Sequence, residues 1–118
     1  MVGTTRRDGT VQLTPLWFEH VAGELRLNAG PRRRWLAHLR RDPRVTLYLA
    51  DPANHHRWAQ IQGRVLALST EGGVDHIESL ATRYGARANG AFAGQERTIV
   101  RIEPLRVTGE DGSRSWRP

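Results

Sequence analysis

The chain has 118 residues, of which 38% are hydrophobic and 25% are charged, and its formal net charge is +6. This composition is typical of one small globular domain and excludes a long disordered chain. Cysteine is absent, which excludes disulfides and thiolate metal sites, and no apolar run is long enough to cross a membrane. The first residues lack the apolar core of a signal peptide, so we expect a cytoplasmic protein.

The start of the chain predicts two strands joined by a tight turn. Residues 4–7 look extended, residues 7–10 contain an Asp-Gly turn, and residues 11–18 alternate between apolar and polar side chains. Pro15 cannot donate to a strand ladder. The second strand therefore lies at a sheet edge, carries a bulge, or is interrupted where a ligand approaches.

A turn at residues 20–23 and a strand over residues 24–28 lead to the first helix, which we expect over residues 32–41. Asp42-Pro43 ends that helix, because a residue before proline avoids helical geometry. All 18 basic residues other than histidine are arginine, and three of them, residues 32–34, stand at the helix start. A high-GC genome explains arginine-only usage, but it explains this local cluster less well. Guanidinium groups and free helix N–H groups both favour phosphate, so this segment predicts an anion site.

The second half of the chain alternates strands and one more helix. Residues 44–50 and 58–68 read as strands, joined by a solvated loop over residues 51–56. A helix opens near Ser69, with apolar residues at intervals of three and four. Residues 85–94 are small and turn-forming, which predicts a mobile loop.

The last strands cover residues 97–103 and 105–108. We therefore assign residues 1–108 to a single domain and residues 109–118 to a poorly structured C-terminal tail. The hairpin-length turns predict mostly antiparallel pairing. The expected fold is mainly β, with six strands and two short helices in a closed or partly open antiparallel barrel.

Four segments carry a family resemblance: TRRDGTVQLTPLWF (residues 5–18), LRRDPRV (39–45), Asp51-Pro52 and RWAQIQGR (57–64). In order and spacing they resemble the pyridoxamine 5'-phosphate oxidase-like split-barrel family, and most closely its branch that uses flavin or the deazaflavin coenzyme F420. The resemblance covers nearly the whole chain. It implies a six-stranded FMN-binding split barrel that forms a homodimer, with a cofactor in each of two grooves between the subunits.

The resemblance also implies roles for individual residues. In the family, a basic segment at the first short helix holds the cofactor phosphate, which assigns that role to Arg33, with Arg32 and Arg34 assisting. Backbone groups of the strand ending in Pro-Xaa-Trp-Phe approach the cofactor ring. The residues expected to border the isoalloxazine or deazaflavin ring are therefore Thr14, Pro15, Leu16 and Trp17.

The first helix departs from the family pattern. The pattern Lys-Xaa-Arg-Asn-Leu reads here as residues 35–39, so Trp35 and Ala37 replace the two basic residues. His38 replaces the Asn and can still donate a hydrogen bond to the cofactor, with packing on the helix face as its alternative. The family usually has a helix before the first strand. Its absence here predicts a shortened start or a barrel without one wall.

Aromatic and histidine residues add further expectations. Trp17 and Trp58 would frame an apolar opening for substrate by stacking, and their alternative is to fill the core or a dimer interface. The pair His55-His56 predicts no metal site, because adjacent side chains of an extended segment point apart and no third ligand is suitably spaced. His76 is expected at the surface of the second helix.

These observations favour an oxidoreductase whose cofactor, F420 or FMN, carries the hydride while the protein supplies position and electrostatics. Its substrate would be a small organic acceptor, and no side chain is assigned as catalytic. No serine-nucleophile, paired-carboxylate or phosphate-cradling glycine motif is recognised. The alternatives are a basic nucleic-acid-binding module and a family member that has lost its cofactor and acts as a dimeric scaffold. Another flat ligand, such as haem, also stays open.

Overall fold

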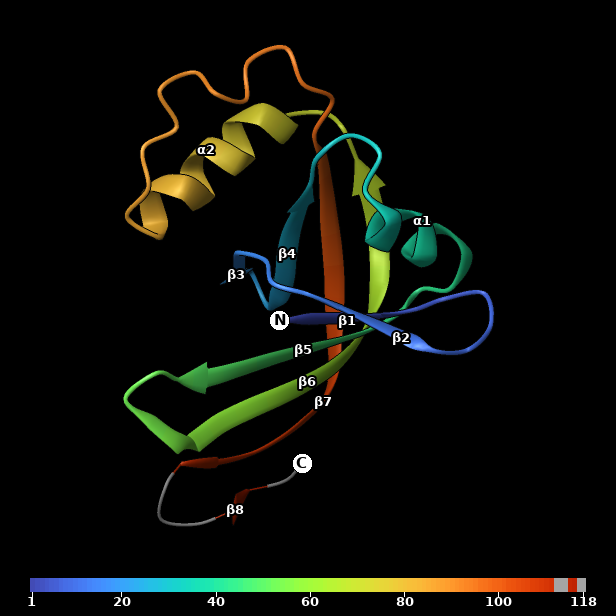
Figure 1. The fold of residues 1–118 in the computed structure, drawn as a ribbon, viewed down its shortest axis with the longest axis vertical. Coiled ribbons are helices and arrows are strands. Elements are labelled where there is room, and N and C mark those ends of the chain that lie inside the picture. The colour runs from blue at the N-terminus through green and yellow to red at the C-terminus, as the bar shows by residue number, and fades with distance from the viewer. Residues whose placement is uncertain (112–114, 117–118) are drawn as a thin grey trace.

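The computed structural model describes residues 1–111 and 115–116 as one antiparallel sheet with two helices (Figure 1). Two helices accompany the sheet, α1 (Arg34–Arg41) and α2 (Gly73–Arg83). The strands are β1 (Val2–Thr5), β2 (Val11–Thr14), β3 (Phe18–Val21), β4 (Glu24–Ala29), β5 (Arg44–Asp51), β6 (Asn54–Ser69), β7 (Thr98–Asp111) and β8 (Ser115–Trp116).

The predicted mainly β, antiparallel architecture with two short helices is confirmed. Hydrogen-bonded neighbours follow the order β2-β1-β5-β6-β7-β4-β3, and β8 pairs with β7. This path has seven strands rather than the expected six, because the strand predicted over residues 11–18 is divided. β2 ends at Thr14, the chain passes through Pro15, and β3 begins at Phe18 on the other edge of the sheet.

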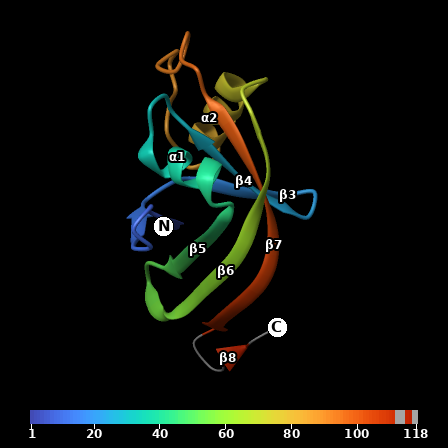
Figure 2. The same ribbon diagram turned by 90° about the vertical axis from the view of Figure 1, so that its right-hand side faces the viewer.

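Two long strands hold the sheet together. β6 has 16 residues and β7 has 14, and they pair along most of their length (Figure 2). The register shifts between Gln62 and Gly63, where the two strands come very close. A Cβ atom at Gly63 would lie 2.7 Å from the carbonyl oxygen of Glu103. Glycine is therefore required at this irregularity.

The core lies between the curved sheet and α1. Trp35, Leu36 and Leu39 form the buried side of α1 and pack against Leu27 and Leu47 of the sheet. Trp35, which replaces a basic residue of the family pattern, is only 2% exposed. It is therefore a core residue that anchors the helix.

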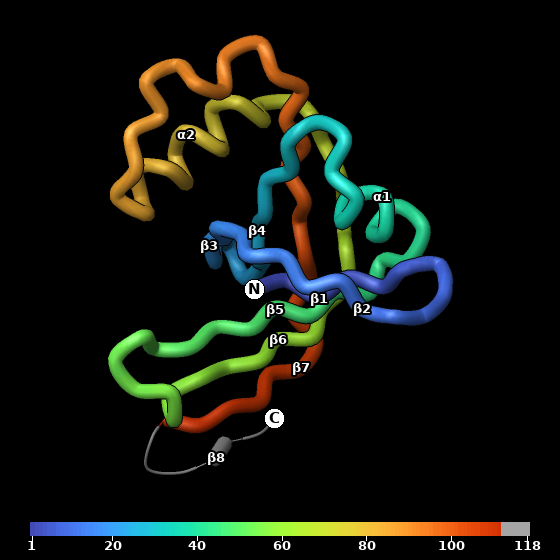
Figure 3. The backbone as a smooth tube through the Cα atoms, in the orientation of Figure 1, coloured from blue at the N-terminus to red at the C-terminus, as the bar shows by residue number. Residues whose placement is uncertain are grey.

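The second helix covers one end of the sheet. Its buried residues include Ile77, Leu80 and Ala81, and it contacts β4 and β7. From the end of α2 the chain runs back over the helix to the start of β7, and this segment contains neither helix nor strand (Figure 3). The predicted absence of helix and strand over residues 85–94 is thus confirmed, and the mobility of this loop stays a prediction.

Two boundaries differ from expectation. The loop predicted over residues 51–56 is wrong, because Asp51 pairs with Asn54 across a two-residue turn and His55-His56 belong to β6. β7 continues to Asp111, beyond the boundary expected at residue 108, while residues 112–114 and 117–118 of the predicted tail lie outside the described residues. Within the described residues, no cluster of three metal-ligating side chains occurs, and neither helix is long and apolar enough to span a membrane.

The contact between α2 and β7 generates a stability prediction. A Cβ atom at Gly73 would lie 1.9 Å from the carbonyl oxygen of Arg97, so Gly73→Ala forces the start of α2 away from the sheet. We expect the free energy of unfolding to fall by about 1–3 kcal/mol. Denaturant unfolding with the exposed Glu71→Ala as control measures this. An unchanged midpoint for Gly73→Ala would contradict the close approach.

The contact between α1 and β1 generates a pH prediction. His38 Nδ1 lies 3.0 Å from Thr4 Oγ1, and burial lowers the pKa of His38 below its usual 6.5. The neighbouring charges of Arg41, Arg6 and Arg34 lower this pKa further. The unfolded chain then binds more protons, so stability is full above pH 6.5 and is lost as the pH falls towards the lowered pKa.

We expect His38→Gln to reduce the loss of stability between about pH 7.5 and about pH 5.5. Urea unfolding at both pH values tests this, with the exposed His56→Gln as the matched control. Equal pH dependence in the wild type and in His38→Gln would rule out this role for the His38 ring.

Candidate functional site

Two adjoining cavities open beside the start of α1, between the β2–β3 connection and the segment that precedes β7. Their volumes are about 390 Å³ and about 430 Å³. The residues that line both are Pro15, Leu16, Asn28, Arg33 and Arg97. Because these residues are shared, one ligand can occupy both spaces.

Most of the predicted site residues meet here. Arg32, Arg34 and Thr14 line the first cavity in addition to the shared residues. Trp17 lines the second, together with Ile77 and Phe92. The first cavity is therefore rich in guanidinium groups, and the second has apolar and aromatic walls.

The turn before α1 directs its arginines to the first cavity. Arg32 has a left-handed backbone with φ of 60°, and Arg33 is extended as the N-cap, so the helix begins at Arg34 rather than at residue 32. The Arg33 side chain makes no capping hydrogen bond, and the first turn contains no acidic residue. The positive end of the helix and the arginine side chains therefore favour the same anion.

Arg97 enters the cavities from the opposite side. Its Nε donates to Asn28 Oδ1 at 2.8 Å, and its Nη1 donates to Gln95 Oε1 at 3.0 Å. The guanidinium carbon lies 5.1 Å from the centre of the Phe92 ring. These contacts hold the guanidinium group where the two cavities join.

Gly30 provides the space in which Arg97 and Arg33 approach each other. A Cβ atom at Gly30 would lie 2.8 Å from Arg97 Nη1 and 3.5 Å from Arg33 Nε. Burial lowers the pKa of Arg97, and the positive charge of Arg33 lowers it further. No arginine that lines the cavities forms an ion pair with a carboxylate in the described part of the chain. An anion bound between them would relieve this repulsion.

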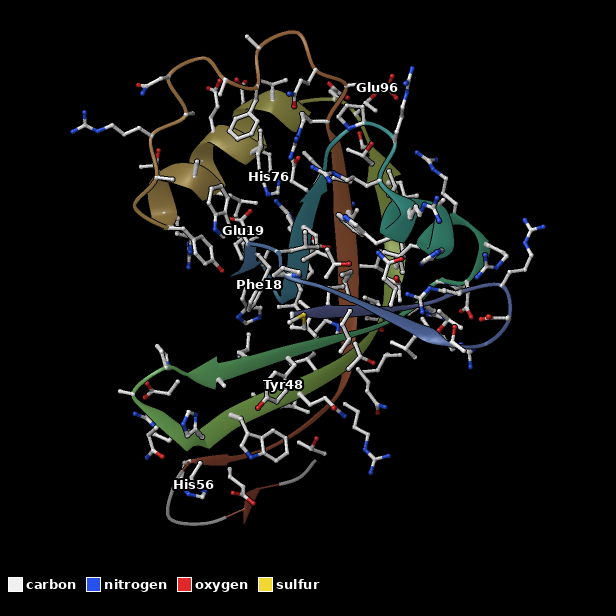
Figure 4. The ribbon with its side chains drawn as sticks, in the orientation of Figure 1. Phe18, Glu19, Tyr48, His56, His76 and Glu96 are labelled. Carbon is white, nitrogen blue, oxygen red and sulfur yellow. The ribbon has the colours of Figure 1, made fainter. Side chains whose placement is uncertain are left out.

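A buried amide supports Arg97 from behind. Asn28 is 6% exposed, and its Nδ2 donates to the carbonyl oxygen of Gly73 at 2.8 Å. The same Nδ2 lies 3.0 Å from His76 Nδ1, and His76 Nε2 lies 2.9 Å from Glu19 Oε1. Figure 4 shows Glu19 and His76 on neighbouring elements at one end of the sheet. The expected surface position of His76 is wrong, because its side chain is only 10% exposed.

The aromatic wall is fixed to α2. The Trp17 ring stacks on Tyr84, with ring centres 5.5 Å apart and an interplanar angle of 19°. The Tyr84 hydroxyl donates to the carbonyl oxygen of Phe18 at 3.0 Å and accepts from the Phe18 N–H at 3.2 Å. The segment after Pro15 therefore keeps a defined position beside the second cavity.

Two predicted site residues do not line these cavities. His38 faces β1, where it contacts Thr4. Trp58 stacks on Tyr48 with ring centres 6.1 Å apart. Figure 4 shows Tyr48 on the lower part of the sheet, well below Glu19 and His76. Within one chain, neither residue lines the cavities beside the arginine cluster, although His38 lies one helical turn after Arg34.

Asn28, Gly30 and Arg97 belong to the site but are not predicted by the sequence alone. The Gly30-Pro31 pair before the arginine run is a signal that the backbone turns sharply there, but it does not show that a second guanidinium approaches. Arg97 joins the site through the pairing of β4 with β7, in which Ala29 lies opposite Thr98. No local pattern reports such a long-range contact.

The chain matches the family model described as pyridoxamine 5'-phosphate oxidase over residues 1–110. No curated protein matches. The solved structure of an F420 reductase has 24% identity to this chain and a TM-score of 0.78, with 90% of this chain and 85% of that chain covered.

A conserved hypothetical protein from Mycobacterium tuberculosis has 25% identity and a TM-score of 0.68, with 98% of this chain and 74% of that chain covered. General Stress Protein 26 from Bacillus anthracis has 12% identity and a TM-score of 0.68, with 99% and 86% covered. These structures share the fold, and the family model spans nearly all of the chain. The chain therefore belongs to the pyridoxamine 5'-phosphate oxidase family.

Proposed function

We propose that this protein binds a phosphorylated flavin-type cofactor, F420 or FMN, in the joined cavities and acts as an oxidoreductase on a small organic acceptor. The observation that carries the proposal is the convergence of Arg33 and Arg97 beside an apolar, aromatic cavity. A phosphate group and a flat ring are two parts of such a cofactor. The arginine-lined cavity suits the phosphate, and the adjoining apolar and aromatic cavity suits the ring.

Each part of the cofactor has a candidate partner in the chain. Arg33, Arg97 and the N–H groups at the start of α1 would hold the phosphate. Pro15, Leu16 and Trp17 would face the ring and exclude water from it. The bound cofactor supplies hydride chemistry, and the protein supplies binding, orientation and electrostatics.

The position of Arg97 argues against the scaffold alternative. Trp35 lies in the core and Ala37 carries no charge, so the family's two basic helix positions contribute no cation here. Arg97 provides a positive charge from the other wall of the same cavity. The site thus keeps two converging guanidinium groups despite the departures in the helix.

We also propose that the protein is a homodimer, as its family resemblance implies. A third groove, of about 810 Å³, is lined by residues of β1, β2, β5, β6 and β7. Its apolar side chains include Val11, Leu13 and Leu105, which are 56%, 65% and 59% exposed. A second copy would remove this apolar surface from water. Trp58 does not line the cavities of its own chain, so any contact with a cofactor would be with that of the partner.

The cofactor proposal predicts the effect of removing either converging arginine. Arg33→Gln and Arg97→Gln are each expected to weaken binding of FMN or F420 by about 1.5–3 kcal/mol, because each removes a charge-assisted hydrogen bond. Fluorescence titration at physiological salt measures both cofactors separately. Arg64→Gln is the control, since Arg64 pairs with Glu103 and lines neither cavity.

Failure of the wild type to bind either cofactor would favour the scaffold alternative. Unchanged affinity in both arginine variants would remove these two residues from the site. Once binding is established, a reduction assay with a panel of small organic acceptors tests the catalytic half of the proposal.

The dimer proposal predicts that a charge in the apolar groove separates the subunits. Leu13→Glu is expected to shift the protein from dimer to monomer, because the carboxylate would lose its hydration in the interface. Sedimentation velocity of the wild type and the variant measures this. Leu66→Glu is the matched control, because Leu66 is 49% exposed but does not line the groove. A monomeric wild type would disprove the proposal.

A further inference from the structure

A line of polar contacts runs from the cavity to the edge strand β3. It joins Arg97 Nε, the Asn28 amide, the His76 ring and the Glu19 carboxylate, with successive distances of 2.8, 3.0 and 2.9 Å. These residues come from four different parts of the fold: the segment before β7, then β4, α2 and β3. Cofactor binding as proposed uses only Arg97 of these four residues. It does not account for the contacts that join Asn28, His76 and Glu19.

Two contacts fix the orientation of the Asn28 amide. Arg97 Nε carries a hydrogen and can only donate, so the amide oxygen must face it. The carbonyl oxygen of Gly73 can only accept, so the amide nitrogen must face that oxygen. The surrounding groups therefore determine which end of the amide is oxygen and which is nitrogen.

The amide orientation determines which His76 protonation state keeps the line intact. The remaining N–H of Asn28 points at His76 Nδ1, so Nδ1 must accept and carries no hydrogen. The hydrogen of the neutral ring is then on Nε2, where it donates to Glu19. If Nδ1 were protonated, two N–H groups would face each other and the contact would become repulsive.

We infer that Asn28 and His76 are positioning residues. The neutral His76 ring orients the Asn28 amide, and Asn28 in turn fixes the Arg97 guanidinium towards the ligand. The inference rests on the proposed cofactor site for the identity of that ligand. Arg97 uses Nε for Asn28 and Nη1 for Gln95, so its Nη2 group is left to meet an anion. A small rotation of the amide would move this group away from the phosphate position.

Two substitutions separate the two nitrogens of His76. The side-chain amide of His76→Asn is short and offers an oxygen near the Nδ1 position, so it can accept from Asn28 but cannot reach Glu19. The longer side chain of His76→Gln reaches the Nε2 position, so it can donate to Glu19 but offers Asn28 no acceptor at Nδ1. The affinities of both variants and of the wild type for FMN and F420 are compared at neutral pH and physiological salt.

His76→Asn is expected to stay within about twofold of the wild type, whereas His76→Gln weakens binding by about threefold to tenfold, the effect of one lost hydrogen bond. Equal effects of the two variants would overturn the inference.

An NMR measurement tests the line of contacts without any cofactor. Long-range ¹H–¹⁵N correlation of the free wild-type protein at neutral pH is expected to show His76 protonated on Nε2 and bare on Nδ1. A neutral ring protonated on Nδ1 overturns the inference even if a cofactor binds, in which case the proposed function stands alone. If the wild type binds neither cofactor, the positioning role falls together with the proposed function, whatever the tautomer.

Discussion

The geometry of the cavities depends on the buried Asn28 amide. This side chain lies on β4, yet it holds the first turn of α2 through the Gly73 carbonyl and the start of β7 through Arg97. An amide can do this because it presents a donor group and an acceptor in one rigid plane. An aliphatic residue of similar size would leave the Gly73 carbonyl and the Arg97 Nε–H unsatisfied in a buried environment, which costs more than the hydrogen bonds themselves gain. The two walls of the site are therefore joined by polar chemistry rather than by apolar packing alone.

The remainder of the fold keeps this junction in place. The long strands β6 and β7 lie near the middle of the sheet and pair along most of their length. The core under α1 fixes the turn that carries Arg32 and Arg33. Trp35 fills that core, so the buried side of the helix carries no charge at this position. The arginines that line the cavity stand instead at the start of the helix. Tyr84 completes the frame by fixing the segment around Phe18 to the end of α2.

Alternating apolar residues, the Asp-Gly turn and the Asp42-Pro43 stop were enough to predict most strands, both helices and the antiparallel class. The errors have local physical causes. Pro15 divides one predicted strand between the two edges of the sheet, and a two-residue turn at Pro52-Ala53 extends β5 and β6 into a segment that looks like a polar loop. Exposed strand ends of this kind carry the same side chains as loops, so composition does not distinguish them.

The site was predictable on one wall only. Arg32, Arg33 and Arg34 stand together in the sequence, and the segment ending in Trp17 resembles a family motif. Short sequence windows therefore predict both groups of residues. Asn28, His76 and Arg97 meet through strand pairing and helix docking, which no single sequence window contains. Trp58 shows the converse case, because an aromatic residue that looks suited to the site lies on a different part of the sheet.

Gly30 carries an evolutionary consequence. Its lack of a side chain leaves room for the Arg97 and Arg33 guanidinium groups, the nearest being 2.8 Å from where a Cβ atom would stand, and is not explained by a left-handed backbone. The preference for glycine at this position therefore depends on the residue at position 97. In relatives whose counterpart of Arg97 is a short residue, the position of Gly30 becomes free to carry alanine or serine, so these two positions are expected to covary while being far apart in the chain.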